Sequence, residues 1–146
     1  MNKNRILQFH KMYLKIAREI SMLSYAERNK VGAIIVKDNN ILAYGFNGTP
    51  NGTNNCCEYY DKNNNLVTKK EVLHAESNAI AKIAKSTNSS ENSILYVTLG
   101  VCIDCAKQII QAGIKEVYYI EDYRDSSGIT LLKHSKIKIN KLSIEE

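Results

Sequence analysis

The second half of the chain alternates between two hydrophobic periods, and this alternation restricts the fold more than any other feature. Apolar residues recur at helical spacing over residues 72–84 and again over residues 102–112. Each of these segments is followed by a short apolar run typical of a buried strand, at residues 94–98 and 117–120. Gly113, directly after the second helical segment, suits a left-handed C-terminal cap. A strand, a short helix and another strand predict two parallel strands joined by a right-handed crossover.

The remaining elements complete one sheet. Apolar residues spaced by three or four predict an amphipathic helix over residues 5–24. Two runs rich in β-branched residues, 31–36 and 41–46, are separated by a polar tetrapeptide and predict an antiparallel hairpin. Residues 137–142 predict a last strand at the edge. We therefore expect an α/β protein with a single domain over all 146 residues: a three-layer α/β/α sandwich around a five-stranded mixed sheet.

Between residues 47 and 70 no periodicity remains, and Gly, Asn, Thr and the single proline, Pro50, take over. A structureless segment of this length inside a compact domain is uncommon and is usually functional. We expect this loop to serve the function of the protein.

The positive charge of the chain is spread along its whole length. The net charge is +5, and the longest basic run is Lys69-Lys70. Polyanion-binding proteins often concentrate their charge in stripes, so a solvated lysine coat is the favoured interpretation and nucleic acid is not an expected partner. Small anionic substrates remain compatible with this charge.

Neither a membrane-spanning helix nor a secretory signal is visible in the sequence. No run of about 18 apolar residues occurs. The first residues lead into a segment interrupted by Gln8, His10, Lys11 and Lys15. A cytoplasmic location is therefore expected, where a Cys-x-x-Cys pair indicates a metal or redox site more than a disulfide.

Two clusters carry chemistry: His74 with Glu76, and Cys102 with Cys105. Each cluster lies where a predicted helix begins, and helix N-termini gather at the carboxyl edge of parallel strands, so the clusters can meet there. One His and two Cys supply three ligands for Zn²⁺ and leave the fourth position for water, as in a catalytic site.

Glu76 lies two residues beyond His74, so the two side chains point in different directions on the first helical turn. The better role for Glu76 is therefore that of a proton carrier between water and substrate. Alone, the Cys-x-x-Cys pair is also typical of a structural zinc site or a redox pair, and a non-enzymatic zinc-binding module stays an alternative.

The combination of His-x-Glu on one helix and Cys-x-x-Cys on the next resembles the zinc-dependent cytidine deaminase superfamily. Val101 stands where that superfamily usually has a proline, a difference that costs rigidity and no chemistry. Within the superfamily, three stretches resemble the deoxycytidylate (dCMP) deaminases: Arg-Asn-Lys-Val-Gly-Ala-Ile at 28–34, the loop from Gly-Phe-Asn-Gly to Cys-Cys-Glu at 45–58, and residues 95–107.

This resemblance implies hydrolysis of dCMP to dUMP and ammonia, which supplies dUMP for thymidylate synthesis, with one catalytic Zn²⁺. It implies that Asn47 and Glu58 contact the deoxyribose 3′-hydroxyl and that the N–H of Ala75 holds the pyrimidine carbonyl. Tyr123 would stack on the substrate or line the sugar pocket. A tRNA or single-stranded nucleic-acid deaminase of the same superfamily is the alternative.

A 5′-phosphate requires cations or free N–H groups around it. The candidates are the side chains of Arg28, Lys30 and Arg124 and the backbone of residues 47–52, which includes Gly48 and Thr49.

The resemblance also implies a homo-oligomer, a hexamer in the dCMP enzymes, regulated by dCTP and dTTP with Mg²⁺ accompanying the nucleotide effector. Some dCMP deaminases bind a second, structural zinc through a cysteine of the long loop and another near the first strand. Cys56 and Cys57 lie in that loop, but residues 24–27 contain no cysteine, so packing as small apolar groups is favoured for both thiols.

Overall fold

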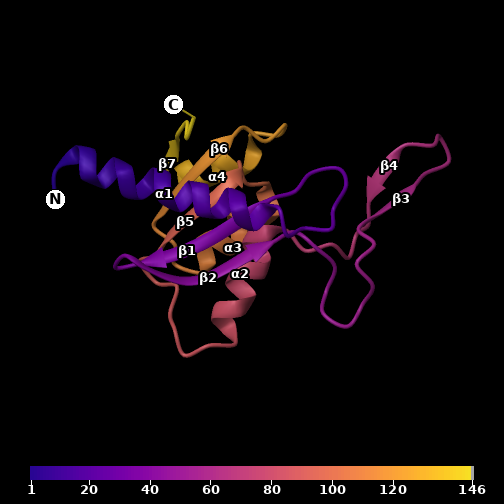
Figure 1. Cartoon of the computed structure of the whole chain (residues 1–146), viewed down its shortest axis with the longest axis horizontal. Coiled ribbons are helices and arrows are strands. Elements are labelled where there is room, and N and C mark those ends of the chain that lie inside the picture. Colours follow the sequence, from indigo (N-terminus) through magenta and orange to yellow (C-terminus); the bar gives the residue numbers. More distant parts are fainter. Residues whose placement is uncertain (146) are drawn as a thin grey trace.

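The computed structural model describes residues 1–145, which are organised around a five-stranded mixed sheet (Figure 1). The strand order is β2-β1-β5-β6-β7, with β1 antiparallel to both neighbours and β5, β6 and β7 parallel. The predicted hairpin, parallel pair and edge strand are thus confirmed. The strands are β1 (Gly32–Lys37), β2 (Asn40–Phe46), β5 (Ile94–Leu99), β6 (Glu116–Glu121) and β7 (Lys138–Lys141).

Helices cover both faces of the sheet and make the predicted three layers. The helices are α1 (Lys3–Ser21), α2 (Ala75–Ala84), α3 (Ile103–Gln111) and α4 (Ser127–His134). On β1, Ile34 and Val36 pack in the core under α1, whereas Ala33 and Ile35 pack with α2 and α3 on the opposite face. This alternation follows from the two-residue period of a strand. In the described part of the chain, no helix has both the length and the apolar character needed to cross a membrane.

The long loop is more ordered than the sequence predicts. It contains a short hairpin of β3 (Glu58–Tyr60) and β4 (Leu66–Thr68), which projects from the body of the molecule (Figure 1). Strands of three residues are too short to show a period, so the expectation of a structureless loop was wrong for these residues.

Two helix boundaries also differ from the prediction, and one helix was not predicted. The first helix ends at Ser21, not at residue 24, and α2 begins at Ala75, not at Val72. Leu73 exchanges two backbone hydrogen bonds with Gly48, which holds it in an extended bridge and delays the helix. Helix α4 was missed because its Ser-Gly start is typical of a loop.

The position of α2 depends on a glycine of the neighbouring strand. A Cβ at Gly45 would overlap the carbonyl oxygen of Ala75 and lie 2.6 Å from the nitrogen of Ala79. The strand and the helix can therefore approach this closely only because residue 45 has no side chain.

We expect Gly45→Ala to lower the free energy of unfolding by about 1–3 kcal/mol, because the added methyl group meets backbone atoms that cannot rotate away. Urea denaturation measures this loss. Gly48→Ala is the matched control, since nothing lies within 4 Å of the position that its methyl group would occupy, and it should change stability by less than about 0.5 kcal/mol. Equal effects of the two substitutions would contradict the packing argument.

His10 belongs to an aromatic cluster under α1. Its ring stacks on Tyr118 with centroids 4.1 Å apart, and its Nδ1 lies 2.7 Å from the hydroxyl of Tyr96. Burial lowers the pKa of His10 below 6.5, opposed by the charge of Glu116 and assisted by that of Lys138. The lowered pKa favours the neutral imidazole, which shares a hydrogen bond with the Tyr96 hydroxyl. These contacts make His10 a packing residue of the cluster.

Because the folded state binds the His10 proton less tightly than the unfolded chain, this residue should make stability fall as the pH drops below 6.5. Urea denaturation between about pH 7.5 and 5.5 tests this. His10→Gln should lose less stability over that interval than the wild type, and His134→Gln, at the exposed end of α4, should lose as much as the wild type. Parallel pH profiles for the His10 variant and the wild type would refute the assignment.

Candidate metal centre and its pocket

The three predicted metal ligands lie at the starts of two helices. His74 is the N-cap of α2, and Cys102 is the N-cap of α3, both with extended backbone. Cys105 follows in the first turn of α3, and its backbone N–H lies 3.5 Å from the sulfur of Cys102. The N-terminal ends of both helices favour anionic groups, here the thiolates that a metal requires.

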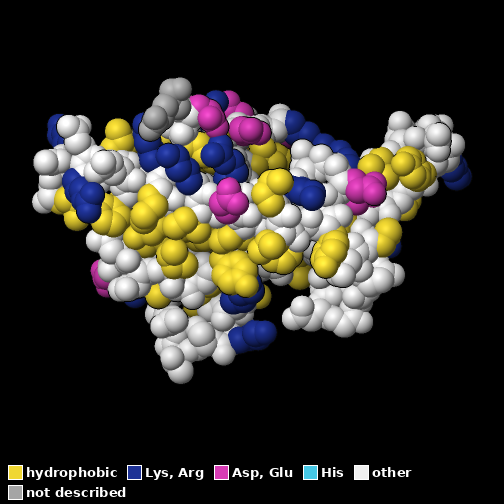
Figure 2. Space-filling model, viewed as in Figure 1, with side chains coloured by type: hydrophobic (Ala, Val, Ile, Leu, Met, Phe, Trp, Pro, Cys, Tyr) yellow, Lys and Arg dark blue, Asp and Glu magenta, His cyan; other side chains and the backbone are white. Residues whose placement is uncertain are grey.

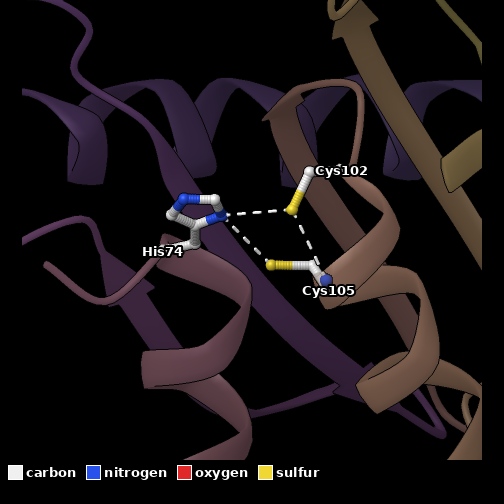
Figure 3. Close-up of side chains that lie close together, drawn as sticks. All are labelled: His74, Cys102 and Cys105. Carbon is white, nitrogen blue, oxygen red and sulfur yellow. Dashed lines mark hydrogen bonds between the residues drawn. The ribbon is translucent and has the colours of Figure 1, made fainter. Parts of the chain in front are cut away.

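The three side chains point toward one another (Figure 3). Nδ1 of His74 lies 3.3 Å from the sulfur of Cys102 and 3.3 Å from that of Cys105, and all three donor atoms lie within 4.8 Å of one another. A tetrahedral zinc ion places N and S ligands at about 2.0–2.3 Å, and hence neighbouring donors at roughly 3.5 Å. A donor set of one nitrogen and two sulfurs at this spacing fits zinc.

The two thiols share their protons unequally. The hydrogen bond from Cys105 is the main cause that lowers the pKa of Cys102 to about 4, and the same interaction raises the pKa of Cys105. The hydrogen bond to Cys102 also raises the pKa of His74. The direction of the shift at Cys102 favours its thiolate, the form that a metal requires.

Glu76 lies in the same site without belonging to the donor set. Only 4% of its surface is exposed, and burial raises the pKa of its carboxyl to about 7. Among the described residues, the group that can hold a metal contains His74, Cys102 and Cys105 and not Glu76. A carboxyl in this position can bind and release a proton near neutral pH.

The metal centre opens into a pocket of about 400 Å³. Most of the substrate contacts expected from the sequence line it, although they come from five separate parts of the chain. Those that line the pocket are Arg28, Asn47, Glu58, Ala75, Tyr123 and Arg124.

Asn47 and Glu58 also hold the wall of this pocket together. The amide of Asn47 accepts the N–H of Val31 at 2.9 Å and donates to the carbonyl of Asn29 at 2.7 Å. The buried carboxylate of Glu58 accepts the N–H groups of Glu27 and Arg28 at 2.9 and 3.1 Å. Both side chains therefore order the segment 27–31, and the amide of Asn47 retains one N–H for a further partner.

Three expected phosphate contacts lie outside the lining of the pocket. Gly48 is bonded to Leu73 through its backbone, and the hydroxyl of Thr49 donates to the carbonyl of Asn54 at 2.5 Å. Lys30 lines an adjoining cavity of about 260 Å³.

The structure also places in the pocket several residues that the sequence did not indicate. Thr68 comes from the projecting hairpin, which the sequence did not reveal, and Leu99 and Gly100 directly precede the segment that holds Cys102. Proximity to the Cys-x-x-Cys pair could have identified the last two. The others are Ala26, Asn29, Val31, Val72, Glu121 and Asp122.

The two loop cysteines lie apart from this centre. Cys57 is buried and its sulfur lies 3.7 Å from the carbonyl of Asn55, whereas Cys56 is exposed with its sulfur 3.3 Å from the carbonyl of Glu58. Over residues 1–145 neither belongs to a group of ligands that could hold a metal.

We expect zinc to raise the free energy of unfolding by about 4 kcal/mol when free zinc exceeds the dissociation constant a thousandfold. Cys105→Ala should abolish this gain, because two donors remain where zinc requires at least three. Thermal denaturation with zinc and with a chelator, together with the metal content of the purified protein, measures both effects. Cys56→Ala is the control and should keep the gain; a Cys105 variant with one tightly held zinc would contradict the assignment.

The known proteins that are similar to this chain include cytidine and deoxycytidylate deaminases. The family model of the cytidine and deoxycytidylate deaminase zinc-binding region matches residues 6–121. Deoxycytidylate deaminase of Enterobacteria phage T4 is 32% identical over 90% of this chain and 93% of its own length. Human deoxycytidylate deaminase is 38% identical over 85% of this chain and 71% of its own length.

A solved structure is similar over nearly the whole chain. The crystal structure of dCMP deaminase from the cyanophage S-TIM5, in complex with dCMP and dUMP, matches with a TM-score of 0.88 and 43% identity. The match covers 97% of this chain and 99% of that one.

Proposed function

This chain belongs to the cytidine and deoxycytidylate deaminases with a zinc-binding region, and from this premise we propose that it hydrolyses dCMP to dUMP and ammonia. Membership of this family confirms the resemblance that we inferred from the sequence motifs. The observation that carries the proposal is the pocket itself, whose lining includes His74, Cys102 and Glu76. The relatives named for dCMP then select the substrate.

In the proposed reaction, three residues bind the metal and a fourth transfers protons. His74, Cys102 and Cys105 hold the zinc, which when bound lowers the pKa of a water molecule and so supplies the nucleophile. Glu76 accepts a first proton from the attacking water and delivers it to N3 of cytosine, and then accepts the second proton of the same water and delivers it to the departing amine. Because Glu76 is buried, its carboxyl exchanges protons with the reacting groups and is shielded from bulk water.

The rest of the pocket orients the nucleotide. The N–H of Ala75 lies at the start of α2, where it has no partner within the helix, and it binds the pyrimidine carbonyl. Asn47, with Glu58 beside it, binds the 3′-hydroxyl, and Tyr123 lines the sugar side of the pocket.

The phosphate requires positive charge, which Arg28 and Arg124 supply at the pocket lining. Lys30, Gly48 and Thr49 are not among the residues that line this pocket, so the proposed phosphate contact is assigned to the two arginines. This arrangement explains how a chain with scattered lysines binds a small anion.

We extend the proposal to assembly and regulation: a homo-oligomer, as a hexamer, with dCTP and dTTP as effectors accompanied by Mg²⁺. Exposed apolar side chains support the assembly. They form a band over the face with α1, β1 and β2 and reappear on the hairpin of β3 and β4 (Figure 2). The exposed apolar side chains include Ile41 and Tyr44 of β2 and Tyr59 and Tyr60 of β3. Light scattering with and without each effector measures the assembly.

Glu76→Gln tests the role of the proton carrier. The amide keeps the shape of the side chain but cannot carry the proton, so kcat for dCMP should fall by about 10²–10⁴ while zinc content and dUMP binding are retained. Glu71→Gln, an exposed glutamate five residues earlier, is the control and should retain wild-type turnover. A Glu76 variant with near-normal kcat would show that another group carries the proton.

Ammonia release decides the substrate. Under the proposed function, dCMP is deaminated faster than deoxycytidine, dCTP, tRNA or single-stranded DNA at equal concentrations. Release from a nucleic acid and not from dCMP would instead identify a nucleic-acid deaminase. A zinc-dependent fold with no release from any of these substrates would identify a binding module.

A further inference from the structure

The projecting hairpin of β3 and β4 reaches the pocket through one cross-strand pair. Glu58 and Thr68 lie directly opposite each other at the base of the hairpin, and both line the pocket. The tip of the hairpin extends away from the sheet (Figure 1). The base of the hairpin is therefore the part that can act on the substrate.

Both members of this pair hold Arg28. The carboxylate of Glu58 accepts the backbone N–H of Arg28 at 3.1 Å, and Nη1 of the guanidinium donates to Oγ1 of Thr68 at 3.1 Å. An exposed arginine ordinarily samples many rotamers. Two contacts from one rigid pair restrict both its backbone and its guanidinium.

The charge of Arg28 is left available by these contacts. Thr68 is neutral and Glu58 binds the backbone of Arg28, and across residues 1–145 the guanidinium forms no salt bridge. An arginine held in place without a paired carboxylate can bind an anion with its full charge.

We propose that Thr68 is a positioning residue that holds the guanidinium of Arg28 toward the 5′-phosphate and so strengthens the preference for the nucleotide over the nucleoside. This inference rests on the proposed function. It also gives the hairpin a role: its base orients a charge at the pocket.

Thr68→Val removes the acceptor and keeps the size and β-branching of the side chain, so the strand should be preserved. One lost hydrogen bond should raise KM for dCMP about three- to tenfold. The value of kcat should change less than KM, because a contact to the phosphate acts equally in the ground and transition states. Thr68→Ser, which retains the hydroxyl, should restore the wild-type KM to within about twofold.

A double-mutant cycle separates positioning from a merely structural role. If Thr68 acts through Arg28, adding Thr68→Val to Arg28→Ala should change kcat/KM by less than about twofold. Thr87→Val, at an exposed threonine beyond α2, is the matched control and should behave as the wild type. Denaturation midpoints of all variants verify that each is folded.

The outcomes distinguish this inference from the proposed function. A wild type that deaminates dCMP, with a Thr68→Val variant of unchanged KM, overturns the role of Thr68 alone. The same holds if the effects of Thr68→Val and Arg28→Ala multiply, or if Thr68→Val lowers kcat without raising KM. A wild type that neither deaminates dCMP nor binds dUMP in calorimetry overturns the proposed function, and this inference with it.

Discussion

The structure depends on the convergence of two helix N-termini at one edge of the sheet. Because β5 and β6 are parallel, α3 must begin beside the end of β5, and α2 begins at the same edge. His74 and Cys102 therefore face each other although 28 residues separate them. Backbone topology brings the donor atoms together, and the helix ends favour the thiolates that a metal requires.

A second set of interactions builds the pocket around this centre. Residues 27–31 have no regular secondary structure, so their backbone groups need other partners. Asn47 and Glu58 supply those partners through their side chains. The two side chains that we propose as substrate contacts thus also hold the wall of the pocket.

The sequence predicted the sheet and the metal centre because both have strong local signals. Periods of two and 3.6 residues identify long elements, and the spacing of Cys102 and Cys105 identifies a metal ligand pair at a helix start. The hairpin was missed because three residues show no period, and α4 because its first turn lacks helix-forming residues. Thr68 could not be assigned to the pocket, since only its pairing opposite Glu58 brings it there.

The hairpin joins the body only at its base, so its two ends are under different constraints. At the tip, Asp61 and Asn64 close a turn with one another, and insertions there leave the pocket undisturbed. At the base, a change alters groups that line the pocket, Glu58 and Thr68, but not the ligands of the metal. The base of the hairpin and the ligands of the metal therefore come from separate pieces of the chain that meet at one pocket.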